Sequence, residues 1–281
     1  MFRSFLVAGI LLMAPQENLS YRADGGDPAP IQQELTYALT LSGPQGLTTQ
    51  LVSSNAALAV EQLRVTRKGR RVITAAGDGG RVEVQIAGAH VEARTRDNKA
   101  LKFDFDQPTA PADLAQDPIR QFAYGFSMAG QRYLLGAKGE YRLDNNDQDG
   151  QAEPMAIMLN VPVRLPDHPV NVGDQWNSEW TGSPRKKDGA TMRFRQTARL
   201  EEIVGPSRRA RISFATSGAL SVPPEKNIQG EEMNLDAKGS ILLDRQSGVV
   251  VASSSAGTMT TEIKKAGLQM VHTITSKTDA P

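Results

Sequence analysis

Apolar and polar residues alternate along much of this chain, which is the pattern of a β-strand with one covered face. In residues 35–41, leucine or tyrosine occupies every second position, and threonine or alanine lies between them. The same alternation recurs in residues 82–86, 101–105, 192–200, 210–214, 259–263 and 268–274. Its longest run spans residues 155–165, where Pro162 on the opposite parity indicates an edge strand or a bulge. The pattern predicts a mainly β fold of antiparallel sheet with one covered face.

One segment has the spacing of a helix instead. Asp117 can cap a helix whose first position is Pro118. Four apolar residues then fall on one helical face: Ile119, Phe122, Ala123 and Phe126. We expect a helix near residues 118–129 that lies across a sheet. Residues 55–67 fit either a helix or a strand, so the sequence predicts one or two helices in all.

An internal repeat divides the chain into two parts. Residues 137–144 and 237–244 share the pattern A-K-G-x-x-x-L-D, and a polar stretch follows each copy. In both copies we expect the glycine to form a turn that enters a short strand. The repeat predicts two related lobes, residues 31–165 and residues 166–281.

Residues 1–30 have the pattern of an export signal and a leader. Arg3 precedes an uncharged apolar run over residues 5–14, which is too short to span a bilayer but suits the core of a signal peptide. A polar stretch follows through Pro30, and we expect it to be flexible. We therefore expect an exported protein of the bacterial cell envelope, periplasmic or extracellular, with no transmembrane segment after signal cleavage.

Composition narrows the chemistry further. The chain has no cysteine, which excludes disulfides, thiolate metal sites and a lipid-modified cysteine. Its formal net charge of +1 argues against a general surface for nucleic acid or anionic membrane. A basic cluster made of Arg67, Lys68, Arg70 and Arg71 is interpreted as a solvated strand face or turn tip.

Two motifs in the second half of the chain resemble those of a known group of proteins. Residues 165–176 read L-P-x-x-P-V-x-V-G-D-x-W, and residues 239–250 read G-x-x-x-L-D-x-x-S-G-V-V. Both are similar to motifs of an uncharacterised, domain-of-unknown-function family of secreted bacterial proteins, many of them lipoproteins. The resemblance implies two β lobes with curved sheets of the lipoprotein-carrier type and no enzymatic activity. This chain departs from the family in lacking the cysteine that would carry a lipid anchor.

The three histidines give no support to an enzyme. We expect His90 on an exposed strand face, His168 in the proline-rich linker and His272 on an interior strand face. No G-x-S-x-G elbow accompanies them, no histidines cluster as zinc ligands, and no glycine-rich turn continues as a P-loop. Asp104 and Asp106 are expected to face solvent. We therefore expect a protein that is not an enzyme and uses no cofactor.

A segment with oxygen-bearing side chains resembles half of a calcium loop. Asn145, Asp147 and Asp149 place such side chains at alternate positions. The twelfth position, counted from Asn145, is Ala156 where a calcium loop needs a bidentate glutamate, although Glu153 lies near it. A solvated hairpin turn is therefore the favoured interpretation, and a calcium site is the weaker one.

Two function classes remain open. The first is a carrier whose curved sheet holds an apolar small molecule or lipid. Its candidate lining residues are Met155, Met192, Met259, Met270, His272 and Trp176. Methionine adapts to irregular ligands, but ordinary core packing explains these positions equally well, and burial at the lobe junction is the favoured role of Trp176. The second class is an interaction or structural module that binds another envelope protein through its surface or edge strands.

The export signal makes a direct prediction. The protein secreted by its host should begin after Ala14, because signal peptidase removes the apolar run. Mass spectrometry of the mature N-terminus measures this. Recovery of the chain with Met1 intact in a cytoplasmic pool would contradict the assignment.

Overall fold

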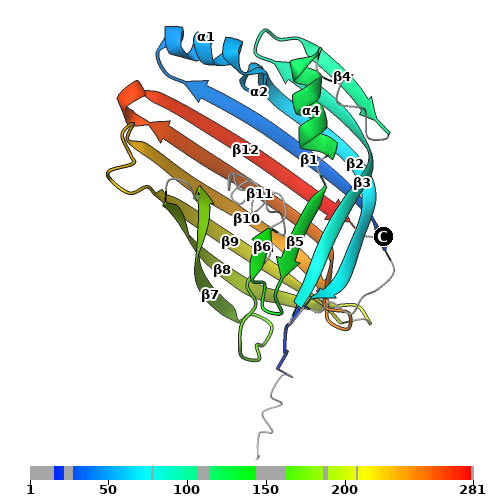
Figure 1. The fold of residues 1–281 in the computed structure, drawn as a ribbon. Coiled ribbons are helices and arrows are strands. Elements are labelled where there is room, and N and C mark those ends of the chain that lie inside the picture. The colour runs from blue at the N-terminus through cyan, green and yellow to red at the C-terminus, as the bar shows by residue number, and fades with distance from the viewer. Residues whose placement is uncertain are drawn as a thin grey trace, which may run out of the picture.

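The computed structural model of the protein describes residues 16–21, 28–76, 79–106, 114, 116–128, 130–143, 163–185, 189–206 and 208–279. Most of these residues lie in β-strands, and the strands form one large antiparallel sheet that curves without closing (Figure 1). The prediction of a mainly β fold with curved antiparallel sheet is therefore confirmed.

The strands occur in an order that places the two chain halves edge to edge. The described strands are β1 (Ala29–Ser42), β2 (Val60–Ala76), β3 (Gly79–Thr95), β4 (Ala100–Phe105), β5 (Gln131–Leu135), β6 (Tyr141–Leu143), β7 (Gln175–Arg185), β8 (Ala190–Val204), β9 (Arg209–Ser221), β10 (Glu231–Asp244), β11 (Val249–Ile263) and β12 (Leu268–Asp279). Their order is β6-β5-β3-β2-β1-β12-β11-β10-β9-β8-β7, and β4 also pairs with β3. We call β1 to β6 the first wing and β7 to β12 the second wing; β1 and β12 join them in the middle of the sheet.

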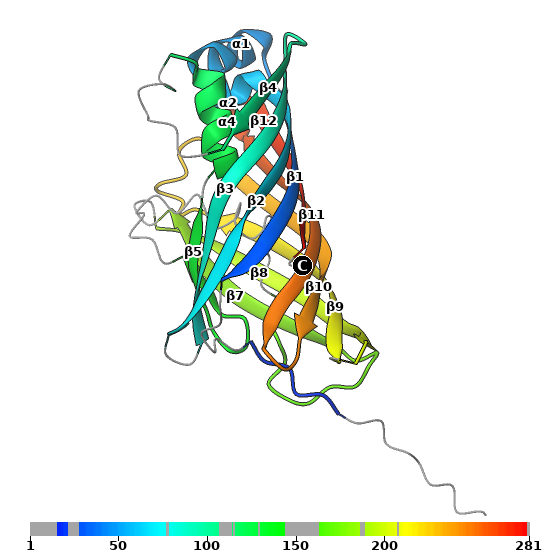
Figure 2. The same ribbon diagram turned by 90° about the vertical axis from the view of Figure 1, so that its right-hand side faces the viewer.

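The sheet curves toward the side that carries the main helix. Seen from the side, β5, β7 and α4 (Pro118–Met128) all lie on this concave side (Figure 2). The helix packs on β2, β3 and β4 and against the short helix α2 (Ala56–Ala59), which follows α1 (Gln45–Ser54). The side chain of Asp117 accepts hydrogen bonds from the N–H groups of Ile119 and Arg120 at 3.0 Å. The capped helix across a sheet is therefore confirmed.

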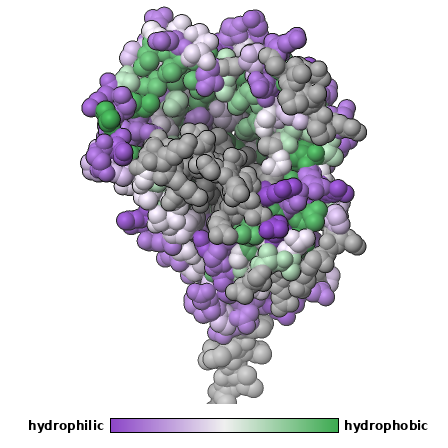
Figure 3. All heavy atoms as spheres, viewed as in Figure 1, coloured by the Kyte–Doolittle hydropathy of each residue, from purple (hydrophilic) through white to green (hydrophobic). Residues whose placement is uncertain are grey.

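The concave face holds the hydrophobic core. On β1, Leu35, Tyr37 and Leu39 are buried, and the residues between them point to the outer face. The strand register continues the row of Tyr37 across the sheet through Ile274, Gly257, Ala237, Thr216 and Gln196. Viewed onto this face, apolar side chains show at the end where α1 lies, within a hydrophilic rim (Figure 3). None of the described helices has the length and hydrophobicity needed to cross a membrane.

The repeated motif does not occupy equivalent positions. In the first copy Gly139 lies in a turn with φ +88° before β6. In the second copy Gly239 lies inside the long strand β10, so the expectation of a turn there is wrong. The two predicted lobes are the two wings of one continuous sheet, and their relatedness stays a prediction.

Two other expectations are resolved by the strand assignments. Residues 55–67, which fitted a helix or a strand, form α2 and then the start of β2. Most of the long run at residues 155–165 lies outside the described residues, and its last three residues, 163–165, belong to no strand.

Gly239 is required by a close approach of two strands. A Cβ atom at this position would lie 2.1 Å from the Ser254 carbonyl oxygen and 2.9 Å from the Phe214 ring. We expect Gly239→Ala to lower the free energy of unfolding by about 1–3 kcal/mol, the usual cost of overpacking. Denaturant titration of both proteins measures this difference in the free energy of unfolding.

Gly46→Ala is the matched control for this prediction. Gly46 is exposed in α1, and a Cβ there meets nothing within 4 Å. Because alanine favours a helix over glycine, this variant should be as stable as the parent or slightly more stable. Equal stability of Gly239→Ala and the parent would contradict the packing argument.

Candidate functional site

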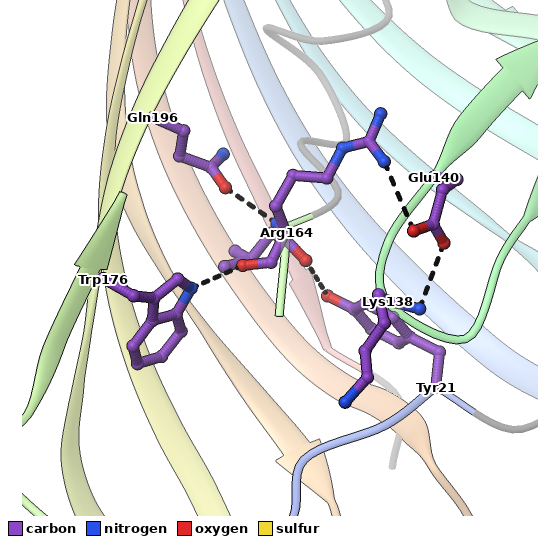
Figure 4. Close-up of polar contacts among 7 residues, drawn as sticks. Tyr21, Lys138, Glu140, Arg164, Trp176 and Gln196 are labelled. Carbon is purple, nitrogen blue, oxygen red and sulfur yellow. Dashed lines mark hydrogen bonds and ion pairs between the residues drawn. The ribbon is translucent and has the colours of Figure 1, made fainter. Parts of the chain in front are cut away.

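A segment on the concave face, residues 163–166, contacts both wings, and we call it the strap. On the second wing, the Arg164 N–H donates a hydrogen bond to the Gln196 side-chain oxygen at 2.7 Å (Figure 4). The Trp176 indole donates to the Arg164 carbonyl at 2.6 Å, and the guanidinium of Arg164 lies 5.1 Å from the centre of the Trp180 ring. Gln196 in turn donates to Thr216 at 2.9 Å, which fixes its amide in the sheet.

The first wing holds the strap through the turn between β5 and β6. The Leu165 N–H donates to the Lys138 carbonyl at 2.8 Å, and the Lys138 amine donates to the Pro166 carbonyl at 2.8 Å. The carboxylate of Glu140 lies 3.7 Å from the Arg164 guanidinium (Figure 4). The glycine of this turn, Gly139, leaves no room for a side chain because its Cβ would lie 2.4 Å from the Val163 carbonyl oxygen.

The N-terminal segment, residues 16–21, is bound beside the strap. The Tyr21 hydroxyl donates to the Val163 carbonyl at 3.0 Å. Glu17 and Val170 exchange two backbone hydrogen bonds, and the buried Glu17 carboxylate forms ion pairs with Arg208 and Arg245. The expectation of a flexible leader is therefore wrong for residues 16–21, because their buried side chains and backbone bonds hold them in the fold.

The concave face has an aromatic end beneath α4. The Tyr37 ring packs against Phe126 at 5.5 Å and Phe122 at 6.2 Å between ring centroids. The imidazole of His272 lies beside it at 5.9 Å, and the two side chains share a hydrogen bond of 3.2 Å between the tyrosine hydroxyl and Nδ1. Burial lowers the pKa of His272 below its usual 6.5 and raises the pKa of Tyr37 to about 12.

The middle of the face is polar and carries a buried cation. The Arg67 guanidinium donates to the Gln33 side chain at 2.7 Å and to the Ser127 carbonyl, in the last turn of α4, at 3.2 Å. Gln33 donates onward to the Thr278 hydroxyl at 2.8 Å. Burial lowers the pKa of Arg67 to about 10, and the carbonyl end of a helix is a favourable place for a positive charge.

Two small cavities lie at the other end of the face, beside Arg71. Their volumes are about 70 and 40 Å³, and Arg71, Tyr21 and Tyr133 line both. Their walls combine residues of the first wing, such as Leu135, with Val250 of the second wing. The curvature of the sheet therefore brings the two wings together around these cavities. This polar end and the aromatic end together form the candidate binding face.

The structure places the predicted lining residues in different surroundings. Met192 and Met259 are buried in the core, and Trp176 is buried against the strap. Met270 and His272 are half-buried and share the inner face of β12. Met155 and the calcium candidates Asn145, Asp147 and Asp149 lie outside the described residues.

The interpretation of the basic cluster is half wrong. Lys68 and Arg70 are exposed, as expected for a solvated strand face. Arg67 and Arg71 lie on the opposite parity of β2, the parity of the buried Val65, and point to the concave side. Polar residues on the apolar parity of a strand were the signal that could have identified them, and Gln33 on β1 follows the same rule.

The remaining histidines lie on the surface. His90 is exposed on β3 with its ring nitrogen 2.7 Å from the Asp104 carboxylate, which is itself exposed, and His168 is exposed in the linker. Among the residues that the structure describes, no group of three or more histidine, aspartate or glutamate side chains could hold a metal ion.

Comparisons with known proteins do not assign this chain to a family. No protein-family model matches the chain, and no curated protein matches it. Among solved structures, the DynF protein from the dynemicin biosynthesis pathway of Micromonospora chersina aligns over 99% of this chain and 92% of its own at 6% identity. The TM-score of 0.22 is too low to support any conclusion about fold or function.

The buried His272 predicts a pH dependence of stability. Because burial lowers its pKa, the unfolded chain binds a proton more readily than the folded protein. The unsubstituted protein should therefore lose stability as the pH falls below about 6.5, which is the pKa of His272 in the unfolded chain. The loss should stop once the pH is below the lower pKa of His272 in the folded protein. Thermal unfolding between pH 7.5 and 5 measures it.

His272→Asn should remove this part of the pH dependence, because asparagine does not titrate. His168→Asn, which changes an exposed ring, is the control and should keep the parent's slope. An unchanged slope in His272→Asn would show that another group is responsible.

Proposed function

We propose that this protein is a non-catalytic binding protein, exported to the periplasm or beyond, whose curved sheet holds an amphipathic ligand on its concave face. The observation that carries the proposal is the division of this face into two chemically different ends. Phe122, Phe126 and Tyr37 form an apolar end, and Arg71 with its two cavities forms a cationic end. A ligand with an apolar body and a polar head matches both.

Half-buried methionine supports the same proposal. Met270 and Met233 both lie on the concave face, on β12 and β10, and pack against the core while keeping part of their surface exposed. Their flexible thioether side chains can adjust to an apolar chain at little cost. A face built only for packing would favour the branched residues that fill cores more rigidly.

A second candidate function rests on the outer face. There the sheet has two shallow depressions of about 670 and 650 Å³, both bordered by Lys238 and Ala256. Arg195, Asp236 and Lys277 add charges of both signs. A surface of this kind suits another envelope protein better than an apolar small molecule.

The two tryptophans of the chain allow a test of the first proposal. Trp176 and Trp180 are the only tryptophans, and both lie on the concave side of β7, where Trp180 stacks on Phe194 at 5.2 Å. A brominated fatty acid quenches tryptophan emission only at short range. If the ligand binds on the concave face, titration should quench the emission in a saturable way.

Trp180→Phe keeps the ring stack and removes the more exposed indole, so it should lose most of the quenching. If the brominated acid bound to the outer face instead, the same titration would leave the emission of both tryptophans unquenched. Absence of quenching, together with no lipid extracted from protein purified from its host, would overturn the carrier proposal. Saturable binding to an envelope protein would then favour the second candidate.

A further inference from the structure

Arg71 has a buried donor atom that forms no hydrogen bond among the described residues, whereas the adjacent Arg70 is exposed and hydrogen-bonded. Its Nε atom is buried and makes no hydrogen bond within the described part of the chain. The adjacent Arg70 points to the outer face, is exposed and donates to the Gln85 side chain at 2.7 Å. Two consecutive arginines therefore have opposite environments.

The surroundings of Arg71 contain hydrogen-bond donors and no negative charge. No acidic side chain lines either of the two cavities beside it among the described residues. The Thr278 hydroxyl accepts a hydrogen bond from the Gln33 amide and so keeps its own proton to donate, and Ser253 also lines the larger cavity. Burial lowers the pKa of Arg71, which reflects the cost of holding an uncompensated charge away from water.

The walls of the cavities are apolar around this donor set. Ile31, Val84 and Leu135 line the larger cavity from the first wing, and Ile241 and Val251 line it from the second wing. A volume of about 70 Å³ exceeds that of one water molecule and accommodates a head group with the start of a chain. The charge, the donors and the apolar walls all favour the same kind of ligand.

We propose that Arg71 binds the carboxylate of an apolar carboxylic acid, with the hydroxyls of Thr278 and Ser253 as further donors. The proposal rests on the proposed carrier function and names its ligand class. The planar guanidinium suits a carboxylate because it donates two parallel hydrogen bonds. The ligand's charge replaces the missing counter-ion of Arg71.

Thermal unfolding with small probes tests the inference. Hexanoate should raise the melting temperature of the parent in a saturable way, because it binds the folded state alone. Hexanamide, which has the same chain without the charge, should bind about tenfold more weakly or worse. Acetate should have less effect than hexanoate at equal concentration, because it lacks the chain.

Arg71→Met and Arg70→Met form a matched pair that removes the same charge from opposite faces of β2. Arg71→Met should abolish the effect of hexanoate, and its melting temperature without ligand should equal or exceed that of the parent, because an unpaired buried charge is gone. Arg70→Met should keep the full effect of hexanoate. Arg71→Lys retains the charge without the planar fork and should give a reduced effect.

Several outcomes would overturn the inference. They are an equal effect of hexanoate in Arg71→Met, an equal effect of hexanamide in the parent, and an equal effect of acetate, which would indicate a site for small free anions. The tryptophan quenching keeps the two proposals separate. Equal quenching of Arg71→Met and parent by the brominated acid would leave the carrier standing and remove the carboxylate site. No quenching of the parent, together with no lipid extracted from the purified protein, removes the carrier itself.

Discussion

The strap joins the two wings of the curved sheet, because its backbone is hydrogen-bonded to both of them. Successive peptide groups of an extended chain point in opposite directions, so one short segment can reach two sides. The N–H and carbonyl of Arg164 bind the second wing, and the N–H of Leu165 and the carbonyl of Pro166 bind the first. The end strands β6 and β7 do not pair with each other, and the strap links them instead.

A fixed curvature explains how polar groups are retained inside the concave face. A buried cation is costly unless it is paired or hydrogen-bonded. Arg67 meets this condition through Gln33 and the last turn of α4, which the capped helix places above it. Arg71 keeps a buried Nε atom without a hydrogen bond in the described part of the chain, and retaining such a group at a cost in stability is more typical of a binding site than of a packed core.

The sequence was sufficient for the parts of the fold that depend on local patterning. Alternation identified most strands, and Asp117 with Pro118 located α4. The sequence was insufficient for features that depend on contacts between residues far apart in the chain. The pairing of β1 with β12 joins residues more than 200 positions apart, and no local pattern encodes it. The glycine of the second motif copy was assigned to a turn because glycine is common there, whereas Gly239 serves the close packing of β10 against Ser254 and Phe214.

The cationic end was missed for the same reason, and one local irregularity shows why. The register of β2 against β3 shifts between Lys68 and Gly69, and the apolar parity of β3 changes there from Val82 and Val84 to Ala89 and Val91. A Cβ at Gly69 would lie 2.1 Å from the Gln85 carbonyl oxygen, so only glycine permits this approach. Bulges and strand glycines bend a sheet sharply. The bend carries the end of the β2–β3 hairpin toward β11, which encloses the cavities beside Arg71. The parity change and the inward parity of Arg71 are both visible in the sequence, but the enclosure of Arg71 between β3 and β11 follows only from the curvature of the sheet.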